Sequence, residues 1–198
     1  MVQNERFASR DRRTKETDIH SSLDLTNAPA PRITTGIPFF DHMLTALSFH
    51  GGLGMTVEAS GDIDVDAHHT VEDVGIVLGE LLNEVRERDP AIRRFGNAVV
   101  PMDDALAEVV LDFGGRPYLV WAVHFPQEYA GSFQLPLLRE FMHGLATRAR
   151  CNLHVRSPYG ENGHHVAEAV FKALGVAVRT AFTPGPYAES SSTIGSGS

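Results

Sequence analysis

A short motif of metal-binding residue types occurs twice in this chain of 198 residues, which holds ten histidines. The pattern His-His-x-x-Glu spans residues 68–72 and again 164–168, so the two copies lie 96 residues apart. On an α-helix, residues four apart lie on one face, whereas neighbouring residues diverge by about 100°. The first histidine and the glutamate of each copy can therefore share a metal ion, and the second histidine points elsewhere. The candidate ligands are His68, His69, Glu72, His164, His165 and Glu168.

One copy cannot easily close a site by itself. Two copies brought together can build two sites, each of which takes the second histidine of the other copy. This arrangement predicts a two-metal centre. The alternative for a lone copy is a polar helix start with a capping carboxylate, and the matched spacing of two copies argues against it. Imidazole and carboxylate ligands suit Mn, Fe, Co or Zn, whereas a structural zinc site more often uses cysteine.

Two further segments should each add one ligand. Residues 38–52 and 135–149 both have the pattern of a short helix, and each precedes one copy of the motif. Aligning these segments pairs His42 with Glu140, and we expect both to bind metal. His143 is the alternative to Glu140, because a phenylalanine lies two residues before His42 and also two residues before His143.

The elements that must carry these residues follow from periodicity and turn signals. Alternating polarity predicts a half-buried strand at 17–25, and the motifs begin segments with the three-and-four spacing of long helices. The β-rich runs 106–113 and 118–125 are joined by Gly-Gly-Arg-Pro, which predicts a hairpin. The remaining predictions are one or two strands within 55–65, a strand at 151–157, and long helices at 66–90 and 164–182.

The repeat spacing, close to half the chain length, indicates duplication and fusion of one unit. We predict an α+β fold of two fused repeats, each a small mixed sheet packed against two helices. Residues 1–92 would form the first repeat and residues 93–187 the second, together making one compact unit. Residues 188–198 are small and polar and would form a C-terminal tail.

Composition excludes several other classes of protein. With 42% hydrophobic and 21% charged residues, the chain falls in the range of globular proteins. Its single cysteine, Cys151, cannot form an internal disulfide and favours a reducing, cytoplasmic setting. The absence of a long apolar run argues against a membrane span, and the charged N-terminal segment argues against a signal peptide. The net charge of −8 argues against nucleic acid or a membrane as a partner.

Several strings resemble the imidazoleglycerol-phosphate dehydratase family, and the resemblance spans about residues 10–182. The strings are RRTKET at 12–17, GIPFFDHML at 36–44, DAHHTVEDVGIVLGE at 66–80, IRRFGNAVVPMDDALA at 92–107, GRPYL at 115–119 and NGHHVAEAVFKA at 162–173. The resemblance implies a lyase of histidine biosynthesis that dehydrates imidazole glycerol phosphate to imidazole acetol phosphate. It also implies two Mn(II) ions per active site and a cytoplasmic homo-oligomer of 24 subunits built from trimers, with active sites between subunits.

The chemistry of that reaction explains the need for metal ions. The proton to be removed lies on a carbon with no neighbouring carbonyl, so a carboxylate base alone is badly matched to it. Two Lewis acids on the nitrogens of the imidazole ring would stabilise an imidazolate, which can expel the adjacent hydroxyl. By resemblance, Glu16 is the acid/base candidate, with Glu168 as a second catalytic residue. An ion pair of Glu16 with Arg13 at the strand edge is the alternative interpretation.

The phosphate of the substrate should bind to basic side chains. Arg94, Arg116 and Lys172 match phosphate-contacting positions of the family, and Ser192 matches a serine in its C-terminal loop. One departure is Ile194, which stands where the family usually has a lysine. Because of this departure, a homologue of low activity and a non-catalytic protein that binds metal or serves assembly stay open as alternatives. A two-metal phosphoester hydrolase is a further alternative, since two-metal centres also serve that chemistry.

Overall fold

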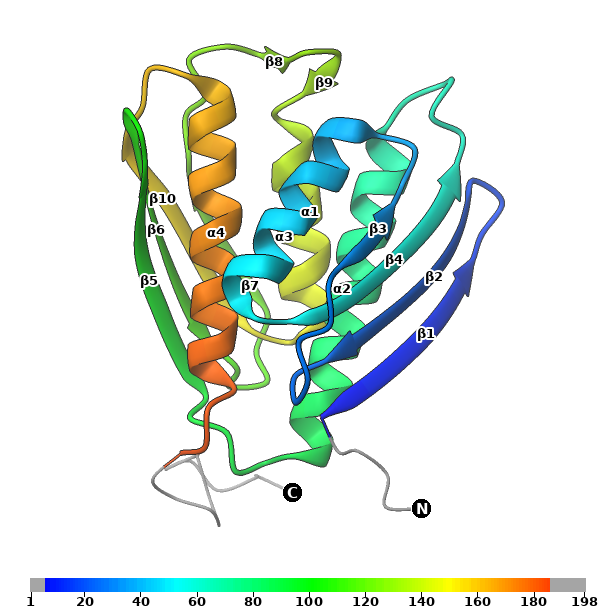
Figure 1. Cartoon of the computed structure of the whole chain (residues 1–198), viewed down its shortest axis with the longest axis vertical. Helices are drawn as coiled ribbons and strands as arrows, with labels where there is room; N and C mark the ends of the chain where they lie inside the picture. The colour runs from blue at the N-terminus through cyan, green and yellow to red at the C-terminus, as the bar shows by residue number, and fades with distance from the viewer. Residues whose placement is uncertain (1–5, 186–198) are drawn as a thin grey trace.

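Two four-stranded sheets form the outer layers of the molecule, and four helices lie between them (Figure 1). The structure is a computed structural model and describes residues 6–185. Its elements are β1 (Phe7–Arg13), β2 (Thr17–Asp24), β3 (Arg32–Thr34), α1 (Pro38–Gly51), β4 (Gly54–Gly61), α2 (His68–Arg88), β5 (Phe95–Met102), β6 (Ala105–Asp112), β7 (Tyr118–Ala122), β8 (Tyr129–Ala130), β9 (Phe133–Gln134), α3 (Leu137–Arg148), β10 (Asn152–Tyr159) and α4 (Gly163–Ala181).

The two sheets have the same topology. The first has the strand order β1-β2-β4-β3 and the second β5-β6-β10-β7. In each sheet the first two pairings are antiparallel and the last is parallel. In the first sheet, α1 precedes and α2 follows β4, which is the last strand of that sheet along the chain. In the second sheet, α3 precedes and α4 follows β10, which is the last strand there. This correspondence confirms the prediction of an α+β fold made of two repeats with mixed sheets.

The helices pack mainly across the repeats. Helix α2 lies against α3, and α1 lies against α4, while α2 also contacts the first sheet and α4 the second. Buried apolar side chains from both repeats belong to one hydrophobic cluster. The two repeats therefore share one core, and each helix pair combines one helix from either repeat.

Close approach of the helices depends on glycines at equivalent positions. A Cβ atom on Gly79 of α2 would lie 2.5 Å from the carbonyl oxygen of Leu145 in α3. A Cβ on Gly175 of α4 would lie 2.2 Å from the carbonyl oxygen of Leu47 in α1. Gly79 and Gly175 are 96 residues apart, as are the two histidine motifs. The same packing thus brings α1 onto α4 and α3 onto α2.

The predicted hairpin between residues 106–113 and 118–125 is wrong. These runs do contain β6 and β7, but β10 lies between the two strands and is parallel to β7. The true hairpin partner of β6 is β5, through a tight turn at Asp103, whose φ is 44°. Leu153 and Val155 of β10 are buried, and only the tertiary fold places this later strand in the middle of the sheet.

The outer faces of the two sheets differ in polarity. Exposed apolar side chains lie on the second sheet, where Val99 is 60% and Val110 52% exposed. The equivalent face of the first sheet carries mostly charged and polar side chains, among them Asp11, Asp18 and His20. The helices within residues 6–185 are too short or too polar to cross a bilayer.

Candidate metal centre

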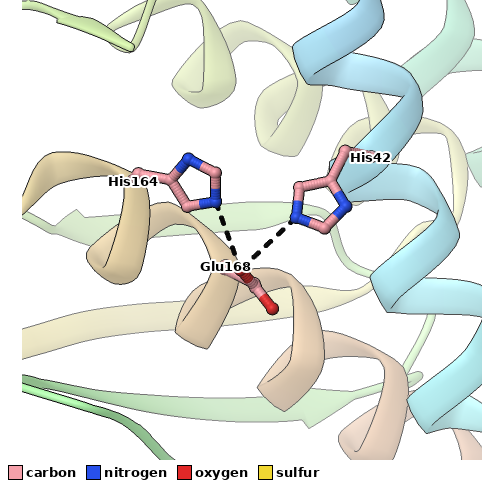
Figure 2. A group of neighbouring side chains, drawn as sticks. All are labelled: His42, His164 and Glu168. Carbon is pink, nitrogen blue, oxygen red and sulfur yellow. Dashed lines mark hydrogen bonds and ion pairs between the residues drawn. The ribbon is translucent and has the colours of Figure 1, made fainter.

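His42, His164 and Glu168 form a cluster at one end of the helix layer (Figure 2). One ligand atom from each lies within 4.8 Å of the others. The Oε2 atom of Glu168 is 3.4 Å from Nε2 of His42 and 3.3 Å from Nε2 of His164. Within residues 6–185 this is the one group of three or more such side chains gathered closely enough to bind a metal.

The cluster depends on the first turns of α1 and α4. The side chain of Asn162 accepts a hydrogen bond from the backbone N–H of His164 and so caps α4. One turn later on the same face lies Glu168, as the four-residue spacing predicts. The packing of α1 on α4 brings in His42. The rings of Phe39 and His164 meet edge to face, with their centroids 5.3 Å apart.

Lys172 holds the other oxygen of Glu168. Its Nζ lies 2.7 Å from Oε1 of Glu168, and both side chains are largely buried. Burial opposes ionisation of Glu168, but the hydrogen bond and charge of Lys172, together with the hydrogen bond of His42, lower the pKa of this carboxyl below its ordinary value. Glu168 is therefore an anionic ligand, and the ammonium of Lys172 lies on it.

The donor set fits a divalent transition metal. In a tetrahedral arrangement, ligand atoms about 2.1 Å from an ion stand about 3.4 Å apart, close to the distances from Oε2 of Glu168 to the two imidazole nitrogens. Two imidazole nitrogens and one carboxylate oxygen suit Mn, Fe, Co or Zn. Three ligands leave coordination positions open, as a site that binds substrate requires.

The first copy of the motif also places its pair on one helix face. Nε2 of His68 lies 3.8 Å from Oε2 of Glu72 on α2. In the described part of the chain, no third ligand is gathered with this pair as His42 is with His164 and Glu168. The first motif therefore forms a partial site.

Glu140 and His143, both on α3, are the two candidates for the third ligand of this partial site. The contacts of Leu47 and Leu145 with their glycines make α1 and α3 equivalent at a spacing of 98 residues, which pairs His42 with Glu140. The carboxylate of Glu140, however, lies 3.1 Å from Arg139. His143 is exposed on α3, slightly less than one turn further along.

The second histidine of each motif contacts a different carboxylate from the first, although the two rings of each motif are neighbours. The rings of His68 and His69 are inclined at 88°, and those of the second pair at 81°. Nδ1 of His69 lies 3.0 Å from Asp62, and Nδ1 of His165 contacts Asp104. These hydrogen bonds raise the pKa of both histidines and lower the pKa of Asp104.

Glu16 lies in the turn between β1 and β2 and is exposed. Oγ1 of Thr14 accepts the backbone N–H of Glu16, and the carbonyl of Glu16 accepts the N–H of Asp62. Arg13 forms an ion pair with Asp18 at 3.5 Å. Among the ion pairs of the described residues there is none between Arg13 and Glu16, which was the alternative interpretation of Glu16. The turn thus fixes the backbone of Glu16 beside the segment that contacts His69.

Two of the predicted phosphate contacts lie far from the cluster of the same chain. The backbone N–H of Arg94 binds the carbonyl of Ala181 at the C-terminal end of α4, about 20 Å along the helix from Glu168. The guanidinium of Arg94 is paired with Asp112. Arg116 follows β6 at the same end of the second sheet, where its carbonyl accepts a hydrogen bond from Asn152. Ser192 and Ile194 lie outside the described residues.

Comparison with known proteins gives a consistent result. The family described as imidazoleglycerol-phosphate dehydratase matches residues 35–178. A relative of that name from Limosilactobacillus fermentum is 49% identical over 184 residues, covering 93% of this chain and 95% of the relative. Another from Gluconacetobacter diazotrophicus is 49% identical over 183 residues and covers 92% of each chain.

Solved structures of the same name share the fold. The dehydratase from Staphylococcus aureus superposes with a TM-score of 0.82 at 36% identity, covering 90% of this chain and 99% of the other. The enzyme from Pyrococcus furiosus, solved in complex with (S)-C348, gives a TM-score of 0.80 at 42% identity, covering 92% and 98%. Sequence, fold and the His/Glu cluster thus lead to one conclusion: the chain belongs to the imidazoleglycerol-phosphate dehydratase family.

Proposed function

We propose that this hydro-lyase of histidine biosynthesis dehydrates D-erythro-imidazole glycerol phosphate to imidazole acetol phosphate at a site with two divalent metal ions, which we expect to be Mn(II). The observation that carries the proposal is the cluster of His42, His164 and Glu168. The motif that supplies His164 and Glu168 is repeated at residues 68–72. Family membership supports the reaction and does not favour the phosphoester hydrolase.

Each metal would take its ligands from two copies of the chain. His42, His164 and Glu168 would hold one ion, and His68 and Glu72, with Glu140 or His143, would hold the other. His69 and His165 do not contact the glutamates of their own motifs but Asp62 and Asp104. We therefore assign these two histidines to the sites of a neighbouring copy, where each would complete one coordination sphere.

When bound, the two ions would supply Lewis acidity to the imidazole ring of the substrate and stabilise negative charge there. The protein supplies proton transfer and positioning. Glu16 would take the proton from the carbon that becomes the ketone and deliver it to the neighbouring carbon that has lost the hydroxyl. The hydroxyl would leave as water with the proton that the resulting enol gives up when it becomes the ketone. Lys172 keeps Glu168 ionised through the contact of 2.7 Å and so keeps it available as a ligand.

Phosphate binding would also need a neighbouring copy. Arg94 and Arg116 lie at the end of the molecule opposite the cluster, so they would contact the phosphate of a substrate bound to another subunit. Ser192 would add a hydroxyl donor. These requirements support a homo-oligomer, for which we expect 24 subunits built from trimers.

Incubation of the Mn-loaded protein with imidazole glycerol phosphate tests the proposal. We expect a ketone product and, by metal analysis, two ions per chain. A His42→Ala variant should lose one ion and most of the activity, whereas His20→Ala, on the outer face of β2, should behave as the parent protein. Release of free phosphate would support the hydrolase instead, and no turnover at any metal load would support a protein that only binds metal.

A further inference from the structure

We propose that Asp62 and Asp104 are positioning residues, which fix His69 and His165 with a proton on Nδ1 and leave Nε2 of each ring as the metal-binding atom. The proposal rests on the ligand roles proposed above for the two histidines. Metal-binding histidines commonly donate their second ring N–H to a carboxylate, and this contact sets both the tautomer and the ring orientation.

The contact at His69 is made by both oxygens of one carboxylate. Oδ1 and Oδ2 of Asp62 lie 3.1 and 3.0 Å from Nδ1 of His69. The backbone N–H of Asp62 binds the carbonyl of Glu16. Asp62 therefore holds the ring of His69 and, through its backbone, fixes the turn that carries the acid/base candidate.

The contact at His165 uses only one oxygen. Oδ1 of Asp104 contacts Nδ1 of His165, while Oδ2 accepts the backbone N–H groups of Glu161 and Asn162. On the other side of the ring, the exposed carboxylate of Asp103 lies 3.6 Å from Nε2, which is beyond hydrogen-bond distance. Asp104 thus fixes Nδ1 firmly, and Nε2 has no comparable partner among the described residues.

The two carboxylates occupy unrelated places in the repeat. Asp62 follows β4, whose counterpart in the second repeat is β10, whereas Asp104 lies in the turn between β5 and β6. The same contact, from a carboxylate to Nδ1 of the second histidine of a motif, is therefore made twice from non-equivalent positions. A contact that was only a remnant of the duplicated fold would be made from equivalent positions, so this pattern points to a requirement of the histidines themselves.

The difference in bonding gives the two asparagine variants opposite expectations. In Asp104→Asn, the amide oxygen must remain with the two backbone N–H groups, so the NH₂ group faces Nδ1 of His165. That group donates, which moves the ring proton to Nε2 and blocks the metal-binding atom. In Asp62→Asn, the amide can turn its oxygen toward His69 and keep the Nδ1–H tautomer.

The test is titration of the metal-depleted full-length protein with Mn(II) at pH 8, with free Mn(II) followed by electron paramagnetic resonance. We expect Asp62→Ala, Asp104→Ala and Asp104→Asn each to weaken the binding of one ion by about 10- to 100-fold. Asp62→Asn should restore affinity to within about threefold of the parent. The melting temperature of each metal-free variant, measured in parallel, reports any general loss of folding.

Asp11 provides a matched control, because its carboxylate contacts Nδ1 of His20 in the same way on the outer face of the first sheet. Asp11→Ala should leave metal affinity unchanged. Equal, parent-like affinities of Asp62→Ala and Asp104→Asn would overturn the positioning role. If His69→Ala and His165→Ala also bind metal normally, the ligand assignments themselves are wrong, and the positioning role is overturned with them.

Discussion

Glu168 connects three cationic or metal-binding side chains through a single buried carboxylate. One oxygen faces His42 and His164, and the other binds Lys172. Because the group is buried, its charge persists only while these partners compensate it. Replacing this glutamate by glutamine removes its charge and keeps its size, so the variant tests metal ligation without changing the packing.

We expect Glu168→Gln to lose one metal ion and to lower turnover at least about 100-fold, since a neutral amide is a poor ligand and removes the partner of Lys172. Elemental analysis and steady-state kinetics measure both effects. Glu161→Gln, at an exposed glutamate just before α4, is the control and should keep metal and activity. Full metal content in Glu168→Gln would contradict the ligand role.

The departure at Ile194 gives a second prediction at this scale. Although the residue lies outside the described part of the chain, the resemblance to the family implies a lysine at this position, whose ammonium would help bind the substrate phosphate. Ile194→Lys should lower KM for the substrate several-fold by adding one charge-assisted hydrogen bond. Ile194→Met is the uncharged control of similar length, and an unchanged KM in Ile194→Lys would refute docking of the tail at the phosphate.

At the scale of elements, most of the architecture could be predicted from the sequence, because the two histidine motifs and the helices around them recur at matched spacings. The histidine motifs define the starts of α2 and α4, and apolar periodicity predicts their length correctly. The pairing of strands was harder to predict from the sequence. The Gly-Gly-Arg-Pro segment at 114–117 does end β6, but local turn chemistry cannot reveal that β10 later inserts beside it. Strands β1, β3, β5, β8 and β9 were also not predicted.

The candidate site shows the same division between local and distant information. The pairs His68–Glu72 and His164–Glu168 follow from helix geometry, and both are confirmed as neighbours. Asp62 and Asp104 could not be predicted, because each comes from a turn and lies 7 or 61 residues before the histidine that it contacts. Their contacts depend on the packing of sheets and helices.

The crossing of α1 and α4 should tolerate no side chain at Gly175. Alanine favours a helix over glycine by about 1 kcal/mol, but the added methyl would lie 2.2 Å from the carbonyl oxygen of Leu47 and cannot avoid it by rotation. We expect Gly175→Ala to lower the free energy of unfolding by about 1–3 kcal/mol.

Thermal melting of Gly175→Ala beside Gly79→Ala and Thr147→Ala checks this. Gly79 makes the equivalent close approach to Leu145, so its variant should be similarly destabilised. Thr147 is exposed on α3 and its variant should melt like the parent. A raised melting temperature in Gly175→Ala would show that the helices can separate at this crossing without cost.

At the scale of the whole molecule, the apolar outer face of the second sheet is a candidate contact between copies. Val110 lies in the middle of this face, paired in register with Asn97 on one side and His154 on the other. Burial of such a face would stabilise association in proportion to its apolar area. The polar face of the first sheet gives an internal comparison, since Ser22 occupies the position of β2 that corresponds to Val110 in β6.

We expect Val110→Glu to reduce the particle mass measured by light scattering, because a buried, unpaired carboxylate would cost several kcal/mol at each contact. Ser22→Glu, the equivalent change on the first sheet, should leave the mass unchanged. Parent-sized particles of Val110→Glu would assign the contact between copies to another surface.

Metal removal should reduce assembly through a different contact. If His69 and His165 bind ions held mainly by a neighbouring copy, each ion joins two chains, and complete chelation cuts these links while the apolar face stays paired. Acidification should act in the same way, since ligation requires neutral imidazole and the contacts with Asp62 and Asp104 raise the pKa of His69 and His165. Metal is therefore retained at high pH and is lost as the pH falls through the raised pKa of these two histidines, above the ordinary imidazole value of about 6.5. Light scattering should therefore show smaller particles after chelation, and single chains when chelation is combined with Val110→Glu. Readdition of Mn(II) at pH 8 should restore the original mass of the parent protein, whereas particles that keep their full mass with no metal bound would contradict the coupling between metal binding and assembly.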